Sequence, residues 1–241
     1  MAKVYQDPKE EAIYEEGKKQ GADDFFQLLL VNVYARKVQD FHNYNTMARK
    51  GGIVFLGDSI TDNYDVYEYY HGYDVYNRGI GGDTSEGVLK RLQESVYELE
   101  PKVVVLLIGT NDFQLCENHQ PADILARIKL ICESIHAHLP KTEIILESIY
   151  PVYNGENPKV DSLSVGSKTN SEIDKTNLLL KAYQQPYIHY LDVNSALKGP
   201  DGNVQLDYTM EGLHTSTTGY FVVTRLVKEA LKELGVVSHE R

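Results

Sequence analysis

Five apolar runs follow one another along the chain from residue 53 onward. They cover residues 53–56, 74–77, 102–108, 143–149 and 187–192. The runs lack the regular alternation of a strand with one face in water, and this is typical of strands buried on both faces of a parallel sheet. We therefore predict a sheet of five parallel strands.

A segment with a helical period follows each run from the second onward. These segments cover residues 84–99, 122–139, 171–183 and 217–234. The first begins at Thr84, a good N-cap residue, and carries Val88, Leu92 and Val96 on one side. Alternation of strands and helices predicts a doubly wound α/β domain. Residues 153–169 are rich in Gly, Asn, Pro and Ser and predict a mobile loop of the kind that borders active sites.

A helical region precedes the first strand. Residues 8–50 have helical character, and Asp23 or Asp24 can cap a helix whose apolar side carries Phe25, Leu28 and Val33. We predict an N-terminal helical extension over residues 1–50 and one larger domain over residues 51–241. An appended apolar helix must bury its face, either on its own domain or on a second subunit, so a homo-oligomer is one of two expectations.

The net charge and the cysteine content limit the binding partners and the cellular location that we expect for this protein. The 241 residues carry a formal net charge of −11, which disfavours nucleic acid and anionic membranes as partners. The two cysteines, Cys116 and Cys132, form no CxxC pair and support no metal site or disulfide framework. Residues 1–20 lack the apolar core of a signal peptide, and the run at residues 25–31 is too short to span a bilayer. We expect a cytoplasmic protein without stable membrane insertion.

Polar residues stand where the predicted strands end. Gly57-Asp58-Ser59 follows the first strand, the turn 77–84 follows the second, and Asn111 follows the third. His214 precedes the last helix. Ligands of open α/β sheets bind at the carboxyl ends of the strands, so these groups are expected to meet at one edge.

Together these groups can perform acyl transfer. A Ser hydroxyl such as that of Ser59 becomes a nucleophile when a His takes its proton, and a carboxylate orients that His. The main-chain N–H groups of Gly82 and Ser59 and the side-chain amide of Asn111 are candidate donors for an oxyanion. Each motif alone is weak, because Ser and Gly are also ordinary turn residues. Their joint order along the chain is what favours chemistry.

The motifs resemble those of the SGNH hydrolases, the GDSL esterase/lipase group. The resemblance is strongest to the bacterial branch that is similar to platelet-activating-factor acetylhydrolase subunits. The resemblance covers roughly residues 50–235 and rests on blocks 57–61, 77–84, 109–112 and 212–214. It implies a flavodoxin-like three-layer α/β/α fold and a catalytic domain over residues 51–241. It also implies Ser59 as nucleophile, His214 as base and Gly82 and Asn111 as oxyanion donors, with no metal and no cofactor.

The chain departs from the family pattern at Glu211, where an Asp is usual. Three interpretations are open: Glu211 is the third member of a triad, Asp207 takes that role, or a main-chain carbonyl orients His214. We favour Glu211. An exposed Glu in a turn, without contact to the His, is the structural alternative.

The predicted function is a serine esterase that hydrolyses small O-acyl esters. Acetylated sugars, lysophospholipids, short-chain esters and thioesters all remain open as substrates. One alternative is a non-catalytic ligand-binding protein of the same fold, with turnover impaired by Glu211. Another is a nucleotide-binding protein that uses the turn 79–82, which is less favoured because Arg78 is the sole basic residue near it.

Two further features have structural interpretations. Asp58 is expected to shape the turn around Ser59 by accepting main-chain hydrogen bonds. The tyrosine-rich run at residues 64–76 is expected to pack the following loop and strand, with an amphipathic wall for a ligand as the alternative.

Overall fold

The computed structural model describes residues 31–239. The chain divides into two compact units, Met1–Asp40 and Phe41–Arg241. In the first unit, the described residues 31–40 are helical. The predicted cap at Asp23 or Asp24 and the apolar side chains around residue 28 lie outside the described residues. The division falls after residue 40, whereas the predicted boundary falls after residue 50.

Residues 41–50 belong to the second unit because their side chains bond to it. The Asn45 amide Nδ2 donates to the Glu94 carbonyl at 2.6 Å and to a Glu98 carboxylate oxygen at 2.8 Å. Asn45 Oδ1 accepts from Arg78 Nη2 at 2.7 Å. In the second unit, residues 41–45 are helical.

The second unit is built on five parallel strands, as the apolar runs predict. The strands are β1 (Ile53–Gly57), β2 (Val75–Gly79), β3 (Val103–Leu107), β4 (Glu143–Glu147) and β5 (Ile188–Leu191). Their order in the sheet is β2-β1-β3-β4-β5, with Phe55 opposite both Asn77 and Val105. This is the flavodoxin-like order, whose direction of winding reverses between β1 and β3.

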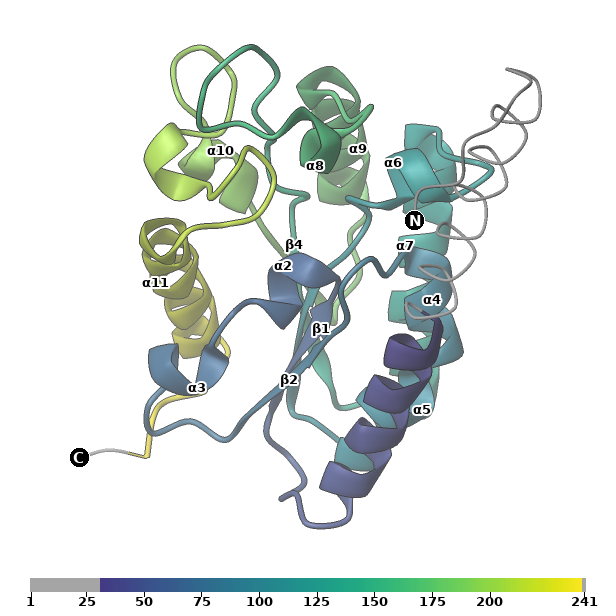
Figure 1. Cartoon of the computed structure of the whole chain (residues 1–241). Helices are drawn as coiled ribbons and strands as arrows, with labels where there is room; N and C mark the ends of the chain where they lie inside the picture. Colours follow the sequence, from purple (N-terminus) through teal and green to yellow (C-terminus); the bar gives the residue numbers. More distant parts are fainter. Residues whose placement is uncertain (1–30, 240–241) are drawn as a thin grey trace, which may run out of the picture. The chain divides into compact units, whose positions relative to one another are not determined.

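Helices cover both faces of the sheet and complete the predicted three layers (Figure 1). The longer helices are α7 (Pro121–His138), α9 (Asn170–Ala182) and α11 (Thr217–Glu233). The shorter ones are α2 (Ser59–Asp62), α3 (Val66–Tyr69), α4 (Ser85–Lys90), α5 (Leu92–Ser95), η1 (Tyr97–Leu99), α6 (Asp112–Leu115), α8 (Ser162–Val165), α10 (Val193–Leu197) and η2 (Leu206–Tyr208).

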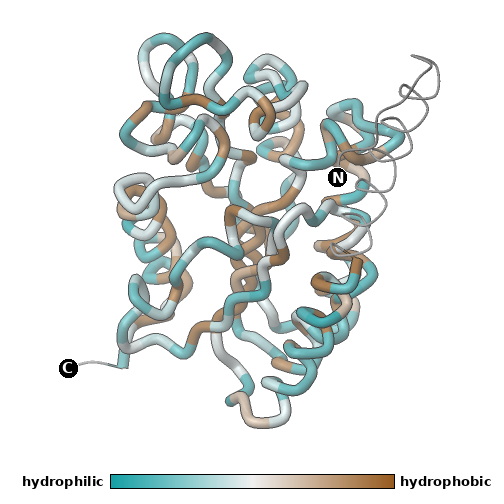
Figure 2. Tube along the Cα trace, in the orientation of Figure 1, coloured by the Kyte–Doolittle hydropathy of each residue, from teal (hydrophilic) through white to brown (hydrophobic). Residues whose placement is uncertain are grey.

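The strands divide their side chains between two cores. Val54 and Leu56 of β1 pack with α4, α5, α7 and α9 on one face, whereas Ile53 and Phe55 pack with α3, α10 and α11 on the other. Figure 2 shows the apolar positions concentrated along the central strands and the inner sides of the helices. Burial of both faces explains why the strands read as apolar runs.

The prediction of one continuous helix over residues 84–99 is wrong. The chain forms α4, α5 and η1 in succession, and the break falls at Arg91, whose φ is −121° and ψ is 18°. Thr84 caps α4 as expected, since its side chain accepts from Gly87 N. The break lets the buried Arg91 side chain donate to groups at the ends of β1 and β2.

The loop at residues 153–169 contains α8 and lies against the segment that precedes His214. Tyr153 N donates to Gly212 O and Asp161 N donates to Glu211 O, each at 2.8 Å. Gly212 has φ +102°, and a Cβ there would lie 2.9 Å from a Val160 methyl carbon. The close approach and the positive φ both require glycine. Within residues 31–239, none of the helices combines the length and the apolar character needed to cross a bilayer.

Candidate active site

Ser59 stands at the carboxyl end of β1, where the chain turns into the short helix α2. Asp58 is the N-cap residue of α2, and its Oδ1 accepts from Ile60 N at 2.9 Å, as expected from the sequence. A Cβ on Gly57 would lie 2.3 Å from the Leu107 carbonyl, so the strand end tolerates no side chain there. The nucleophile candidate is thus held at the point between β1 and β3 where the sheet reverses its winding.

Ser59, His214 and Glu211 form one chain of hydrogen bonds. The distance from His214 Nε2 to Ser59 Oγ is 3.0 Å. His214 Nδ1 bonds to Glu211 Oε1, and the same oxygen accepts from His214 N at 3.3 Å. An ionised carboxylate can only accept, so Nδ1 carries a proton and a neutral ring presents Nε2 as an acceptor to the Ser59 hydroxyl. This is the tautomer that general-base catalysis requires.

Asp207, the other carboxylate predicted as a partner of His214, makes a different contact. Its main-chain carbonyl accepts a hydrogen bond from Ser216 Oγ at 2.6 Å. Glu211 is therefore the carboxylate that lies beside His214. Its other oxygen, Oε2, is buried and has no hydrogen-bond partner within the described part of the chain.

Gly82 and Asn111 lie shortly after the ends of β2 and β3. Gly82 has φ +76°, and no atom lies within 4 Å of a Cβ built on it. Asn111 is buried, does not cap α6 with its side chain, and donates from Nδ2 to Asp83 O at 2.9 Å. This bond uses one amide hydrogen of Asn111 and leaves the second for another acceptor. The main-chain N–H of Gly82 has no acceptor among residues 31–239.

Asp58 lies in an unusual electrostatic environment directly before the nucleophile candidate. Its side chain is fully buried, and burial raises its pKa to about 7, with the nearby carboxylates of Asp83 and Asp112 adding to the rise. The Ile60 N–H acts in the opposite direction. Asp58 Oδ2 has no partner among the described residues. Asp58 thus titrates near neutral pH beside the site.

Buried tyrosines of the tyrosine-rich run pack in one core with β2 and α2, as the packing interpretation expects. Tyr64 is buried and stacks on Tyr220 with ring centroids 4.4 Å apart. The Tyr220 hydroxyl donates to the Ile60 carbonyl at 2.6 Å. Tyr220 therefore joins α11, the helix that follows His214, to α2, the helix that carries Ser59. No role was predicted for Tyr220 from the sequence, although it lies within residues 50–235, over which the family resemblance extends.

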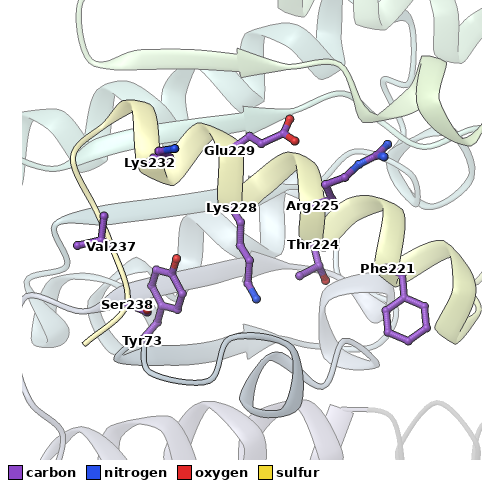
Figure 3. A pocket seen from close by; sticks show the side chains of 9 residues that line it. All are labelled: Tyr73, Phe221, Thr224, Arg225, Lys228, Glu229, Lys232, Val237 and Ser238. Carbon is purple, nitrogen blue, oxygen red and sulfur yellow. The ribbon is translucent and has the colours of Figure 1, made fainter. Parts of the chain in front are cut away.

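A groove of about 610 Å³ along α11 is separate from these residues (Figure 3). Its walls are formed by Tyr73, Phe221, Thr224, Arg225, Lys228, Glu229, Lys232, Val237 and Ser238. None of the five candidate residues lines it, so it is not the predicted site. Across residues 31–239, no group of three or more His, Cys, Asp or Glu side chains is placed to hold a metal ion.

Comparison with known proteins supports the resemblance. A profile of the GDSL-like lipase/acylhydrolase family matches residues 55–221. Platelet-activating factor acetylhydrolase IB subunit alpha1 of Rattus norvegicus is 27% identical over 187 residues, which cover 76% of this chain and 75% of that protein.

Solved structures agree with the fold. A Streptococcus pneumonia protein described as a platelet activating factor superposes with a TM-score of 0.79 at 27% identity, covering 88% of this chain and 99% of that one. A GDSL-like lipase of Bacteroides thetaiotaomicron shares the fold, with a TM-score of 0.70 at 22% identity over 82% of this chain and 98% of that one. The chain therefore belongs to the GDSL-like lipase/acylhydrolase family.

Proposed function

We propose that the protein is a serine esterase that hydrolyses small O-acyl esters through an acyl-enzyme on Ser59. The observation that carries the proposal is the hydrogen-bonded chain from Ser59 Oγ through His214 to Glu211, with 3.0 Å between Oγ and His214 Nε2. Nucleophile, base and orienting carboxylate within hydrogen-bond reach are the arrangement that nucleophilic catalysis needs.

The reaction proceeds in two halves. Ser59 Oγ attacks the ester carbonyl carbon while His214 Nε2 takes the hydroxyl proton, giving a tetrahedral intermediate with a negative oxygen. The intermediate collapses, the C–O bond to the alcohol breaks, and His214 returns its proton to the leaving alkoxide. Water then attacks the acyl-enzyme with His214 as base, which releases the carboxylic acid and regenerates Ser59. Glu211 keeps the imidazole in the required tautomer and stabilises the imidazolium.

The oxyanion is stabilised by three donors in this proposal. They are the N–H groups of Ser59 and Gly82 and the second amide hydrogen of Asn111. Gly82 supports this role because its main-chain N–H has no acceptor among the described residues. Donors of this kind are worth on the order of 10²–10³ in rate each.

We infer acetyl and other short acyl esters as the first substrates to test. The rat relative carries the name acetylhydrolase, and a Bacteroides fragilis structure at 28% identity is described as an acylhydrolase.

The test combines turnover with active-site labelling. The full-length protein is mixed with p-nitrophenyl acetate, and separately with a fluorophosphonate that modifies activated serines. We expect turnover and labelling in the wild type and neither in Ser59→Ala. Asp207→Ala, which removes a carboxylate that does not contact His214, is the matched control and should keep both signals.

Two outcomes contradict the proposal. Labelling that persists in Ser59→Ala would place the reactive group elsewhere. Absence of both labelling and turnover in the folded wild type would favour the non-catalytic ligand-binding alternative.

A further inference from the structure

Arg91 is a buried cation beside the ends of β1 and β2. Its side chain is 1% exposed, and its Nε donates to Asp83 Oδ2 at 2.7 Å in an ion pair whose carboxylate is 2% exposed. In a helical register the position belongs to the buried side, with Val88, Leu92 and Ser95. Removing a charge from water costs several kcal/mol, so this guanidinium needs many partners.

The remaining nitrogens of Arg91 donate to partners that include the main-chain carbonyls at two strand ends. Nη2 donates to the Gly57 carbonyl at 2.9 Å, two residues before Ser59. Nη1 donates to the Arg78 carbonyl at 2.9 Å, at the end of β2, and to Ser95 Oγ at 2.8 Å. One planar group therefore fixes the end of the nucleophile strand relative to the end of the strand that leads to Gly82.

Asp83 extends the connection to the other predicted donors. It follows Gly82 directly, and its main-chain carbonyl accepts from Asn111 Nδ2 at 2.9 Å. Its Oδ1 accepts from Thr84 N at 2.9 Å. Through Asp83, Arg91 is joined to the turn that carries Gly82 and to the Asn111 side chain.

Stability alone is a weak reason for such a pair. Well-packed apolar residues often replace a buried ion pair without loss of stability, whereas removal of one partner leaves an uncompensated charge. Arg is the residue suited to this task because its planar fork donates in several fixed directions, and Lys offers a single point of attachment. The geometry is suited to holding the end of β1, the end of β2 and the Asn111 side chain at fixed distances from one another.

We propose that the Arg91–Asp83 pair is a positioning element of the esterase site. It sets the distances from Ser59 to the Gly82 N–H and to the Asn111 amide, and acts on the oxyanion through them. The inference rests on the proposed function and adds to it two residues that do not touch substrate.

The test uses Arg91→Lys and Asp83→Asn in the full-length protein. A misplacement of donors by a fraction of an ångström to about 1 Å costs up to about 100-fold in rate. We expect kcat to fall about 10- to 100-fold while KM changes by less than about threefold, because substrate binding does not depend on the oxyanion donors. The affinity for a trifluoromethyl ketone, whose tetrahedral adduct carries an oxyanion, should fall in parallel with kcat/KM.

A double-mutant cycle separates positioning from general damage. Arg91→Lys in an Asn111→Ala background should cost clearly less than in the wild type, because Asn111 is one of the groups it positions. Ile135→Ala is the stability control, since Ile135 is fully buried in α7 and the change costs about 2–5 kcal/mol. That variant should keep kcat at a temperature where it is folded.

The outcomes distinguish the two proposals. If the wild type and Ile135→Ala turn over ester and both pair variants keep full kcat and ketone affinity, the positioning role is overturned and the esterase stands. If Arg91→Lys does not fold, the nearly isosteric Asp83→Asn variant decides alone, at a temperature below its melting transition. Absence of Ser59 labelling in the wild type would instead remove the proposed function.

Discussion

Glu211 Oε1 accepts two hydrogen bonds from the same residue, one from the His214 ring nitrogen Nδ1 and one from the His214 main-chain N at 3.3 Å. The main-chain bond ties the carboxylate to the turn, so the longer Glu side chain has less freedom than its extra methylene suggests. The ring bond then fixes the imidazole relative to that turn. In this way a Glu occupies the place where the family pattern has an Asp.

The first prediction concerns this contact. Glu211→Gln should lower kcat on the order of 10²–10⁴-fold, because an amide can present N–H to Nδ1 and favour the wrong tautomer. Glu211→Asp should lower kcat less, since the charge remains and the shorter side chain draws the ring away from Ser59. Steady-state kinetics with p-nitrophenyl acetate measure kcat of both variants. Asp207→Ala, the control, should retain wild-type kcat, and equal losses in Glu211→Gln and Asp207→Ala would contradict the assignment.

The second prediction concerns Gly82. Gly82→Ala should meet no steric clash, because the space around the new Cβ is open, but its φ of +76° disfavours a side chain by on the order of 1 kcal/mol. We expect a reorientation of the N–H and a loss of kcat of about tenfold or more with little change in KM. Gly202→Ala is the matched control, with φ +81° and equally open surroundings in another loop. If both variants lose stability equally and neither loses kcat, Gly82 is not a donor.

The third prediction concerns the link between α11 and α2. Tyr220→Phe keeps the stack on Tyr64 and removes the hydroxyl that donates to the Ile60 carbonyl. The loss should cost about 1 kcal/mol in the free energy of unfolding and several-fold in kcat, because Ser59 and His214 are then less firmly related. Tyr70→Phe is the control: the Tyr70 hydroxyl bonds with the Tyr64 hydroxyl and does not reach α2. Urea denaturation and kinetics should show similar stability losses and an activity loss confined to Tyr220→Phe.

The fourth prediction concerns pH and stability. Glu147, at the end of β4, is buried, and burial raises its pKa from 4.5 to about 8, with a single hydrogen bond from the Tyr150 hydroxyl at 3.3 Å opposing the rise. The folded state therefore holds this proton more tightly than the unfolded state. Its contribution makes the free energy of unfolding fall as pH rises from about 4.5 to about 8, and then level off.

Glu147→Gln removes that contribution. The variant should be more stable than the wild type at pH 8.5 by on the order of 1 kcal/mol or more, and the difference should shrink or reverse at pH 5. Asp58, whose pKa is raised to about 7 by burial, leaves a remaining fall between about pH 4 and pH 7 in both proteins. Urea midpoints across this range measure the effect, and parallel curves for the two proteins would show that Glu147 does not titrate as expected.

Much of the fold follows from local patterns in the sequence. Strands buried on both faces are apolar at most positions, so the five runs indicated a parallel sheet before any contact was known. Parallel strands bring their carboxyl ends to one edge, and therefore Ser59, Gly82 and Asn111 had to arrive on the same side. The order of the motifs along the chain was enough to suggest the family.

The break at Arg91 could not be predicted in this way. A helical period reports which side of a segment is buried, and Val88, Leu92 and Val96 satisfy that period whether or not the helix is continuous. The one signal was a charged residue on the apolar side. Two of its four hydrogen bonds go to carbonyls at the ends of two strands, which only the packed sheet brings within reach.

The sequence by itself determined the kind of sheet, the edge at which the polar groups gather and the residue types available there, because these depend on burial and strand direction. The tertiary structure decided which carboxylate lies beside His214, how Asp83 joins Arg91 to Asn111, and that Tyr220 ties the last helix to the helix that carries Ser59. Each of these depends on distances between side chains far apart in the sequence, which rotamers and packing set to within tenths of an ångström and no local pattern encodes.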